Sequence, residues 1–437
     1  CLRTGPRTLG RERGRILVDD RFDVLVVGAG PAGSIAALVL ARGGARVALV
    51  DKATFPRDKA CGDLVGPRGV QLLTDLDLIV PGAIPVRDMI VVGPTGGRVR
   101  LPCFPGRTYP DHALAVPRVS FDAMLRDAAI AAGAVPFVGQ AVEPLEGANG
   151  IDGFALTGGT RLRADAIVGA DGATSRVGAT AGLVDHDRVM WGFAIRSYLD
   201  QSVDLPAIVL WEPSRWRALP GYGWLFPGPD GRANVGLGVG TLADRTAGAR
   251  AVQRMPEFLD HLQRLGLLRP GRHPSARLGG WLKMGMVGTT PAAGRVLLVG
   301  DAAGLVNPLQ GEGIAQALRS GHAAAGAILG TAGRSGHAAA RYRAWLADEH
   351  LPYQGIAAAM QSALLPHPTV IAGVGRVLTL PVVGPTLAPG WSVFWNELLD
   401  GAVPGRARTT AALATRVGRV TAARTRTWRW LDNTFSS

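Results

Sequence analysis

Cysteine is scarce in this 437-residue chain. The three cysteines, Cys1, Cys61 and Cys103, form no CxxC pair and no spacing typical of metal ligands. This argues against a disulfide framework, and an iron–sulfur cluster would need about four thiolates. We therefore expect a protein of the reducing cytoplasm that holds no metal.

Long apolar runs are also lacking. No uninterrupted stretch reaches the ~20 apolar residues that a membrane-spanning helix needs. Residues 1–21 contain six arginines but no apolar core of the kind found in signal peptides. We expect this stretch to be a disordered leader in front of the first domain.

Lysine is nearly absent. Only Lys52, Lys59 and Lys283 occur, so arginine supplies almost all of the basicity behind the formal net charge of +13. Such a charge favours anionic partners, among them nucleic acid and acidic lipids. No helix-turn-helix, zinc-finger or RNA-binding signature is present, so we expect no nucleic-acid partner.

A strand–helix–strand unit opens the fold. Phe22–Val27 is almost entirely apolar and predicts a buried strand of a parallel sheet. Pro31–Arg42 predicts a helix with proline at its first position, and Arg46–Val50 predicts the second strand. The turn before the helix reads Gly28-Ala29-Gly30-Pro31-Ala32-Gly33, in the context that a dinucleotide-binding fingerprint requires.

The residues of this turn have separate physical roles. Gly28 permits the tight turn, Gly30 lets the backbone approach a pyrophosphate, and Gly33 lets the helix pack closely on the strand. The helix that Pro31 and Ala32 open presents free N–H groups to the phosphates. The turn therefore predicts a binding site for a dinucleotide.

Two acidic positions extend the pattern. Asp51 ends the second strand, where a carboxylate binds ribose hydroxyls and repels a 2′-phosphate, which favours FAD or NAD over NADP. Lys52 follows it and belongs to the expected cofactor site. In Ile167–Arg176 an expected strand delivers Asp171-Gly172 into a turn, where Asp171 can orient groups around the dinucleotide.

A third motif lies in residues 297–313. The residues expected to hold the cofactor here are Gly300, Asp301, Pro308, Gly311, Gly313 and Ile314. Asp301 follows a strand and is placed to bind the ribityl hydroxyls or the pyrophosphate end. The helix that begins at Ile314 can stabilise negative charge on a reduced flavin, and Glu312 is interpreted as a first-turn acid rather than a catalyst. Three motifs in this order predict FAD.

One arginine between the motifs completes the expected cofactor site. Arg118 comes just before a helix predicted over Ser120–Ala132, with Ser120 as its cap. From this position the guanidinium can reach the ribityl and phosphate region of FAD.

The order of the elements predicts an α/β fold. We expect a glutathione-reductase-like Rossmann FAD domain, an antiparallel β-sheet substrate domain and a helical C-terminal region. The expected FAD domain is discontinuous and consists of residues 22–80, 102–185 and 285–345. Residues 81–101 and 186–284 are assigned to the substrate domain, and residues 346–437 to the C-terminal region.

The chain resembles the geranylgeranyl reductase family, within the para-hydroxybenzoate-hydroxylase-like flavoproteins. Besides the three motifs, the resemblance rests on residues 55–63 (FPRDKACGD), 221–227 (GYGWLFP) and 233–238 (ANVGLG). It implies FAD as cofactor, electrons from transient NAD(P)H or another donor, and reduction of isolated prenyl double bonds. Where family members often have a basic residue after Phe-Pro, this chain has Gly228.

The resemblance also implies roles for particular residues. It places Cys61 and Gly62 near the isoalloxazine ring, and the strand with Tyr222, Trp224 and Phe226 along the prenyl cavity. Independently, period-two spacing puts these three rings on one face of a strand, where they could line an apolar slot. We expect Cys61, Tyr222 and Trp224 to act in catalysis, with Cys61 or water as proton donor.

Other functions share the three motifs. A flavin monooxygenase that hydroxylates an aromatic or polyketide-type substrate is the main alternative. A halogenase is less favoured because it needs a lysine to carry the activated halogen, and none lies between Lys59 and Lys283. A flavin sensor without turnover is a further class. Gly236–Gly240 is interpreted as strand packing, so the sequence has no second dinucleotide fingerprint, and the electron donor is either a transiently bound NAD(P)H or an external carrier such as a protein.

Two further predictions concern the strand and the C-terminal segment. Arg196 is interpreted as an exposed strand arginine in preference to a diphosphate ligand. Prolines break residues 369–395, which argues against a membrane span. Residues 405–431 contain seven arginines and no acid, with tryptophans near the end, and predict peripheral contact with the inner face of a membrane.

Overall fold

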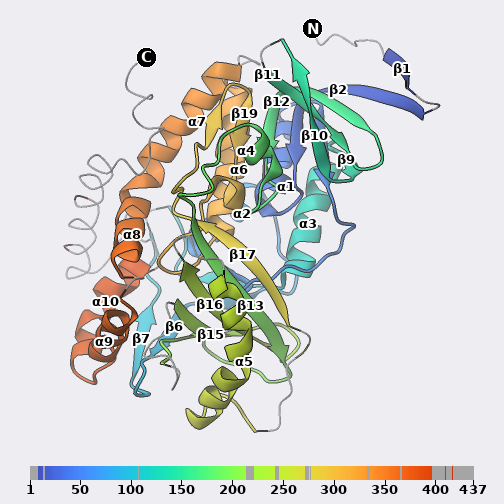
Figure 1. Cartoon of the computed structure of the whole chain (residues 1–437). Coiled ribbons are helices and arrows are strands. Elements are labelled where there is room, and N and C mark those ends of the chain that lie inside the picture. The colour runs from blue at the N-terminus through green and yellow to red at the C-terminus, as the bar shows by residue number, and fades with distance from the viewer. Residues whose placement is uncertain are drawn as a thin grey trace.

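The computed structural model describes most of the chain. The described residues are 8–12, 15–106, 108–148, 150–212, 221–241, 246–270, 275, 277–331, 335–364, 367–395, 409 and 416. Two large sheets dominate the described part, one above the other in Figure 1.

The upper sheet has nine strands and contains the expected strand–helix–strand unit. Its strands are β1 (Thr8–Glu12), β2 (Arg15–Val27), β3 (Val47–Asp51), β9 (Val135–Val138), β10 (Ala141–Gly147), β11 (Gly150–Leu156), β12 (Arg161–Gly169), β18 (Ala292–Ala293) and β19 (Val296–Leu298). The strands β9, β3, β2, β12 and β19 run parallel to one another. Their carboxyl ends therefore meet at one edge, where α/β folds bind ligands.

Helices cover this sheet and form its main core. They are α1 (Pro31–Arg42), α2 (Pro67–Asp75), α3 (Arg118–Ala131), α4 (Arg176–Thr180), α6 (Ile314–Leu329) and α7 (Ser335–Glu349). The helix α1 packs between α3 and α6. It is buried over most of its length because its residues are small and apolar. This packing fixes the start of α1 against the glycine-rich turn.

A small sheet of three strands consists of β4 (Leu64–Val65), β5 (Ile84–Val86) and β8 (Ala113–Ala115). The lower sheet has seven strands. Its strands are, in spatial order, β17 (Leu278–Met284), β13 (Met190–Leu199), β16 (Ala233–Thr241), β15 (Gly221–Pro227), β14 (Ala207–Val209), β6 (Asp88–Val92) and β7 (Arg98–Pro102). All neighbours are antiparallel except β14 and β6. The helix α5 (Thr246–Arg264) covers one face, and the other face is free to line a cavity.

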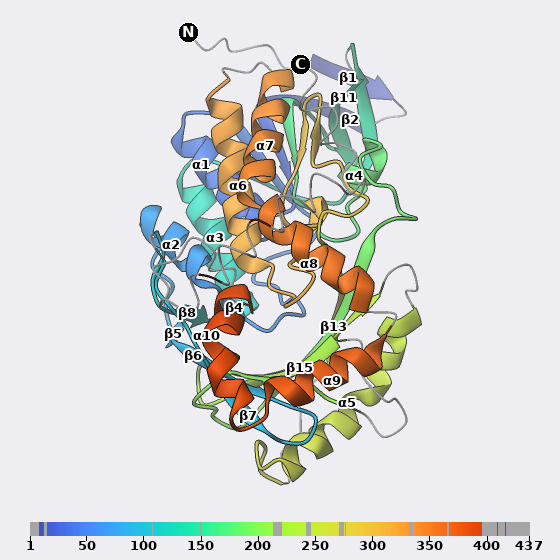
Figure 2. The ribbon, with the colours of Figure 1, turned by 90° about the vertical axis from the view of Figure 1, so that its left-hand side faces the viewer.

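Three helices follow α7 along the side of the molecule that faces the viewer in Figure 2. They are α8 (Leu351–Leu364), α9 (Pro368–Leu378) and α10 (Val383–Trp395), and α10 packs against β7. Within the described residues, no helix has the length and apolar character needed to cross a membrane. The basic segment 405–431 lies outside the described residues apart from positions 409 and 416.

Two sequence expectations are wrong. Within the expected disordered leader, β1 pairs antiparallel with β2, which begins at Arg15 rather than Phe22. Ile16 to Val18 are β-favouring residues that continue the strand past the globular core. Ser120 is not a helix cap, because α3 begins at Arg118 after the extended Pro117, and Ser120 donates back to the Pro117 carbonyl at 3.0 Å.

Candidate functional site

The glycine-rich turn is shaped by close backbone contacts. A Cβ on Gly28 would lie 2.2 Å from the Ala170 oxygen, and one on Gly33 would lie 1.8 Å from the Gly28 oxygen. A Cβ on Gly30 would meet only the Arg57 guanidinium, at 3.5 Å. Gly28 and Gly33 are thus required by the fold, whereas the backbone at Gly30 is open on the side where a phosphate would bind.

The start of α1 has unused donors. Its cap residue is Gly30 and no side chain caps it, while Pro31 occupies the first turn and Ala32 is buried behind it. Asp51 accepts from the Ala29 N–H at 2.7 Å and from the Ala53 N–H at 2.9 Å, which fixes the carboxylate at the strand end beside the turn. Lys52 is exposed. Free N–H groups at a helix start attract a pyrophosphate.

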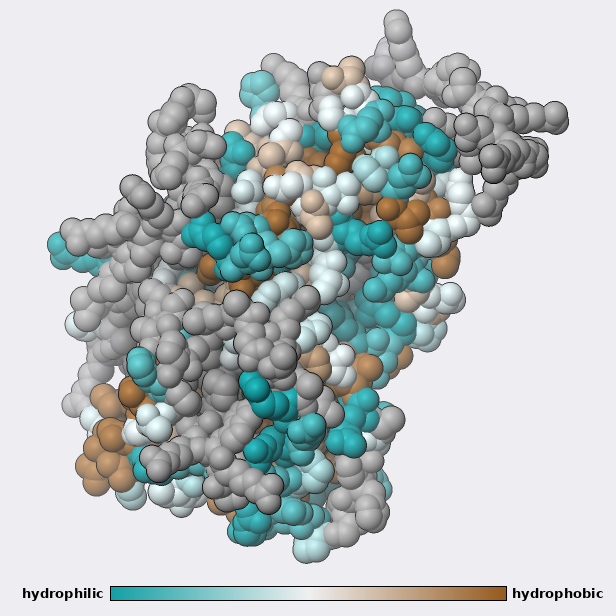
Figure 3. Space-filling view, viewed as in Figure 1, coloured by the Kyte–Doolittle hydropathy of each residue, from teal (hydrophilic) through white to brown (hydrophobic). Residues whose placement is uncertain are grey.

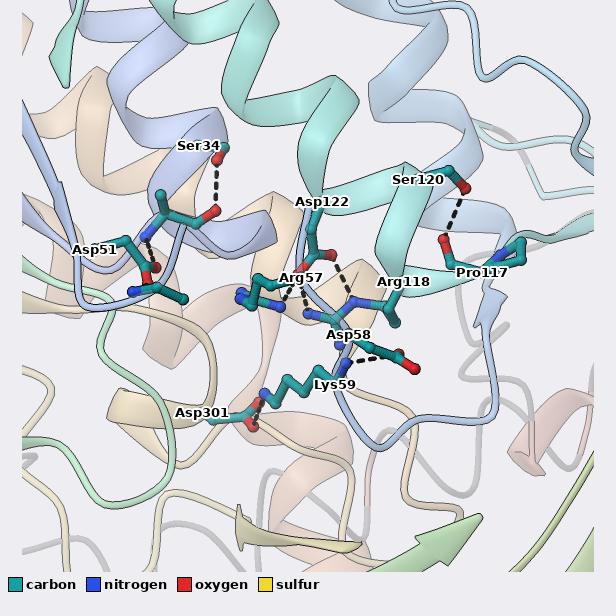
Figure 4. A network of polar contacts seen from close by, with 12 residues as sticks. Ser34, Asp51, Arg57, Asp58, Lys59, Pro117, Arg118, Ser120, Asp122 and Asp301 are labelled. Atoms are coloured by element: carbon teal, nitrogen blue, oxygen red, sulfur yellow. Dashed lines mark hydrogen bonds and ion pairs between the residues drawn. The ribbon is translucent and has the colours of Figure 1, made fainter. Parts of the chain in front are cut away.

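A buried ion cluster lies beneath this turn. Arg118 donates two hydrogen bonds to Asp122, at 2.6 and 2.7 Å, and Arg57 donates a third at 2.7 Å (Figure 4). Burial alone would lower the pKa of Arg118, but the Asp122 carboxylate outweighs it and the pKa is raised. Arg118 is therefore permanently charged, and it lines the cavity described below.

An ion pair joins two motifs that are far apart in sequence. The Lys59 ammonium lies 3.2 Å from the Asp301 carboxylate, as Figure 4 shows. Asp301 belongs to a short 3-10 helix, Gly300–Ala303, and the Gly300 N–H donates to Ser320 of α6 at 3.0 Å. The pair brings the loop after β3 to the carboxyl end of β19, so both segments can contact one cofactor.

Asp171 is occupied by its own turn. Its carboxylate accepts from the Ser175 hydroxyl and from the Arg176 and Val177 N–H groups, the latter two at 2.7 and 3.1 Å. It therefore organises the start of α4, and burial raises its pKa. The adjacent Gly172 has φ +84°, and nothing lies where a Cβ would be.

The turn before α6 is also internally braced. Glu312 accepts from the Ala315 N–H at 2.7 Å, but it precedes the cap residue Gly313 and so lies before the first turn of α6, not in it as expected. Gly311 has φ +71°, and a Cβ there would lie 3.2 Å from the Tyr222 hydroxyl. That hydroxyl donates to the Gln310 carbonyl. The turn thus touches the aromatic strand β15 directly.

A cavity extends from the expected cofactor site to the lower sheet. It is lined on the first side by Pro31, Lys59, Cys61, Gly62, Arg118, Asp301, Pro308, Gly311, Gly313 and Ile314. On the second side it is lined by Met89, Leu101, Phe193, Ile208, Tyr222, Trp224, Phe226 and Leu282. The second side is therefore mainly apolar, although Arg87 and Asp88 next to Met89 also belong to its lining.

The three rings of β15 lie on one face, as their spacing predicts. Ring centroids are 6.3 Å apart for Tyr222 and Trp224 and again for Trp224 and Phe226. The neighbouring strand makes room for them, because a Cβ on Gly236 would lie 2.2 Å from the Trp224 ring. Gly236 is thus a packing glycine, which confirms that 236–240 is no second dinucleotide fingerprint.

Asn234 connects this face to the Cys61 loop. Its side-chain nitrogen donates to the Cys61 carbonyl at 2.7 Å and to Asp63 at 2.9 Å, and its oxygen accepts from the Trp224 ring N–H at 2.8 Å. Tyr198 also donates to Asp63, whose pKa is raised by burial. Burial likewise raises the pKa of the Cys61 thiol, and the Arg118 guanidinium opposes this only in part.

Arg196 is not the exposed strand residue that was expected. It is 2% exposed, pairs with Asp58 and lies over the Tyr198 ring, with its guanidinium carbon 4.2 Å from the ring centroid. The loop that precedes Cys61 folds onto β13 and covers it. Arg196 therefore holds the loop in place, and it is absent from the cavity lining.

Lys283 is fully buried next to both acidic motifs. Burial lowers its pKa to about 8, while Asp171 and Asp301 act in the opposite direction. Within the described part of the chain, its ammonium nitrogen has no hydrogen-bond partner. Its neighbours in β17, Leu282 and Met284, line the cavity, whereas Lys283 points to the other side of the strand.

The structure brings most of the predicted site residues to one cavity. Those outside its lining are Gly28, Gly30, Ala32, Gly33, Asp51, Lys52, Asp171, Gly172 and Gly300. Sequence reasoning missed Lys59, Asp63 and Asn234 as site residues. A signal existed for Asn234, since it is the only amide in the run ANVGLGVG of small and apolar residues.

These residues fit FAD. The open backbone at Gly30, the uncapped start of α1 and the carboxylate of Asp51 suit a pyrophosphate and a ribose. Arg118 and the Lys59–Asp301 pair lie between them and the apolar end of the cavity. Together they provide binding groups along the length of a dinucleotide.

Comparisons with known proteins agree with this fit. Residues 21–342 match the model of an FAD binding domain family. The chain is 37% identical over 317 residues to a menaquinone reductase of Mycolicibacterium smegmatis, which covers 70% of this chain and 76% of the relative. It is 32% identical over 312 residues to a digeranylgeranylglycerophospholipid reductase of Methanopyrus kandleri, covering 69% and 79% respectively.

Solved structures share the fold. A geranylgeranyl bacteriochlorophyll reductase-like protein of Thermoplasma acidophilum aligns with a TM-score of 0.69 at 20% identity, over 95% of this chain and all of that one. A flavin-dependent brominase aligns with a TM-score of 0.65 at 16% identity, over 93% of this chain and all of that one. The chain is an FAD-dependent oxidoreductase that belongs to the geranylgeranyl reductase family of para-hydroxybenzoate-hydroxylase-like flavoproteins.

Proposed function

We propose that the enzyme reduces an isolated C=C bond of a prenyl chain. The observation that carries this proposal is the cavity itself, whose far end is walled by aromatic and aliphatic side chains from β15, β14 and β7. Such a wall binds a flexible hydrocarbon by burial of apolar surface. The finer fold assignment, a glutathione-reductase-like Rossmann domain with a substrate domain and a helical C-terminal region, is part of the same proposal.

The relatives support the substrate class. The printed names of two of them specify menaquinone and digeranylgeranylglycerophospholipid, and both compounds carry prenyl chains. The two relatives, at 37% and 32% identity, differ in the head group of the substrate that their names specify, but both substrates carry a prenyl chain. We propose a prenyl lipid as substrate for this chain, with the head group left to experiment.

Trp224, Phe226 and Cys61 have separate roles in the proposed reaction. When bound and reduced, FAD supplies the hydride for one alkene carbon. Trp224 and Phe226 hold the alkene in a dry, apolar slot. The Cys61 thiol, whose pKa is raised, keeps its proton at neutral pH and can donate it to the other carbon. Solvent then restores the proton to sulfur.

The positions of Trp224 and Cys61 are set by the groups around them. Asn234 bonds both the Trp224 ring and the Cys61 carbonyl, so the ring and the thiol keep a fixed relation. The Tyr222 hydroxyl donates to the Gln310 carbonyl, and burial raises its pKa, so it positions the turn before α6. Fixed geometry of this kind raises the rate of a proton transfer.

The electron donor is a second part of the proposal. We propose transient NAD(P)H or an external carrier, since residues 236–240 lie within strand β16 and not in a strand-to-helix turn of the kind that binds a dinucleotide. Anaerobic NADPH would bleach the flavin absorbance within seconds if it is the direct donor. An unbleached flavin that a carrier protein then reduces would select the external donor.

The test of function is product mass. The reduced enzyme is incubated without oxygen with a menaquinone and with a geranylgeranyl lipid, and products are read by mass spectrometry. A gain of two hydrogens that remains after the quinone ring has been reoxidised in air supports the proposal, because reduction of the ring to the quinol adds the same mass. A gain of one oxygen that needs air would replace it with a monooxygenase, and incorporation of bromide would replace it with a halogenase.

A further inference from the structure

Within the described residues, α9 and the turn that leads to α10 present apolar side chains to solvent. On α9, Val370, Val374 and Val377 are 49%, 47% and 51% exposed, and their spacing puts them on one side of the helix. In the turn between α9 and α10, Leu380 and Val382 are 47% and 79% exposed. Figure 3 shows brown surface at the lower left, where Figure 1 places these helices.

The opposite side of the same helices is firmly attached to the lower sheet. The Ser392 hydroxyl donates to the Pro102 carbonyl, and Thr379 fits against Gly93 and Gly97 of the β6–β7 turn. Ala372 and Ala388 are 7% and 4% exposed. The fold therefore holds the exposed valines of α9 on the outer side of the described helices.

The inner side of α10 packs against the wall of the cavity. Ala388 and Trp391 of α10 belong to the same apolar cluster as Leu101, Trp224 and Phe226. Leu101, Trp224 and Phe226 also line the cavity. The exposed helices therefore lie next to the end of the cavity where hydrocarbon is proposed to bind.

Charge favours an anionic lipid surface as the partner. Residues 368–395 contain no acidic residue, and their one basic residue, Arg376, pairs with Glu212. The chain that continues past α10 has seven arginines and no acid in residues 405–431, and the whole protein has a formal net charge of +13. A basic segment that follows an apolar surface along the sequence is typical of proteins that lie on acidic bilayers.

We infer that the α9–α10 face docks onto an anionic lipid bilayer and that the prenyl chain enters the cavity from there. Aliphatic side chains without polar groups between them suit a fluid hydrocarbon better than a second protein surface, which needs polar groups to fix its register. The entry route rests on the proposed function, whereas the docking surface does not.

The test compares two triple variants in vesicle co-sedimentation. V374S/V377S/V382S removes the apolar face, and I79S/V135S/V138S removes equally exposed apolar side chains from the far side of the fold. All six side chains are exposed, so both variants are expected to fold. With phosphatidylcholine vesicles that contain about one third phosphatidylglycerol, the first variant should lose at least about tenfold in affinity, and the second should bind like the unchanged protein.

Each other outcome overturns the inference. If the first variant binds vesicles as tightly as the unchanged protein does, the contact is assigned to residues 405–431 alone. If the unchanged protein does not bind vesicles, a membrane is not the partner of this face. A dimer that the first variant disperses, without vesicle binding, would make the face a self-interface. If docking holds, the first variant should reduce detergent-dispersed substrate at the normal rate and vesicle-embedded substrate slowly. If neither the unchanged protein nor either variant reduces any substrate, that result counts against the proposed function and not against the docking surface.

Discussion

Trp224 donates its ring N–H to the Asn234 side chain at 2.8 Å, and the same amide holds the Cys61 carbonyl at 2.7 Å. The buried Asn234 side chain thus fixes the position of the Trp224 ring relative to the backbone of Cys61. Asn234 is fully buried, and it also bonds the buried carboxylate of Asp63. Loss of Asn234 should therefore affect both stability and the product-forming step.

The variant Asn234→Leu keeps the number and branching of the side-chain heavy atoms and removes all three hydrogen bonds. It leaves the Trp224 N–H, the Cys61 carbonyl and the Asp63 carboxylate with one partner fewer, at about 1–3 kcal/mol for each, so we expect a loss of at least about 4 kcal/mol in the free energy of unfolding. Urea denaturation measures it. In the Trp224→Phe background the same change should cost less, because the ring N–H is already gone, and an equal cost would contradict the hydrogen bond.

Cys61→Ala tests the proton donor. We expect product formation to slow by about 100-fold while flavin reduction keeps its rate, because only the proton transfer is affected. Stopped-flow absorbance separates the two steps. Cys61→Ser retains a proton donor, so its rate of product formation should lie between those of Cys61→Ala and the unchanged enzyme. Because burial raises the pKa of the Cys61 thiol, the unchanged enzyme should stay active above pH 9.0, the ordinary pKa of a thiol. Unaltered product formation in Cys61→Ala would assign the proton to water.

Arg118→Met tests the buried ion cluster. The change leaves Asp122 with Arg57 as its remaining cationic partner in the cluster, and we expect a loss of about 3 kcal/mol in stability together with weaker FAD retention. Thermal unfolding and the flavin content of the purified protein are the measurements. Arg126→Met alters a pair near the surface of the same helix and should cost under about 1 kcal/mol. Equal losses in both variants would refute the role of burial.

Lys283→Met should stabilise the flavin-free protein. The folded pKa of about 8 lies below the unfolded value, so between these values the unfolded chain binds more protons and stability rises with pH. At pH 7 the buried ammonium is destabilising, and its removal should add about 2 kcal/mol to the free energy of unfolding. The gain should shrink as pH approaches about 10. Lys52→Met at an exposed position is the control, and a loss of stability in Lys283→Met would contradict the expected penalty.

The cofactor motifs could be predicted because their geometry is local. Gly33 meets the Gly28 carbonyl of its own turn, and Asp51 ends the strand that follows the α1 helix, whereas the Ala170 carbonyl that Gly28 meets comes from a distant segment. The aromatic face of β15 was equally predictable, since alternation along one strand decides which side chains share a side. The role of a residue can be predicted from the sequence when its neighbours in space are also near it in sequence.

The remaining parts of the site depend on contacts across the fold. The partners of Asn234 are Cys61, Asp63 and Trp224, which belong to two other segments. Arg196 was misjudged because a loop over a hundred residues earlier in the chain covers it. The cap at Ser120 failed because Pro117 already turns the backbone into the helix. No pattern in one segment shows what another segment will place upon it.

The Lys59–Asp301 pair has a consequence for the order in which the protein is made. Its two residues are 242 positions apart, and β19, which leads to Asp301, inserts beside β12 in the same sheet as β2. A ribosome adds about 5–20 residues each second and releases the chain from its N-terminus. The glycine-rich turn is therefore translated long before the strand that completes its pocket, and flavin loading has to wait until most of the polypeptide has left the ribosome.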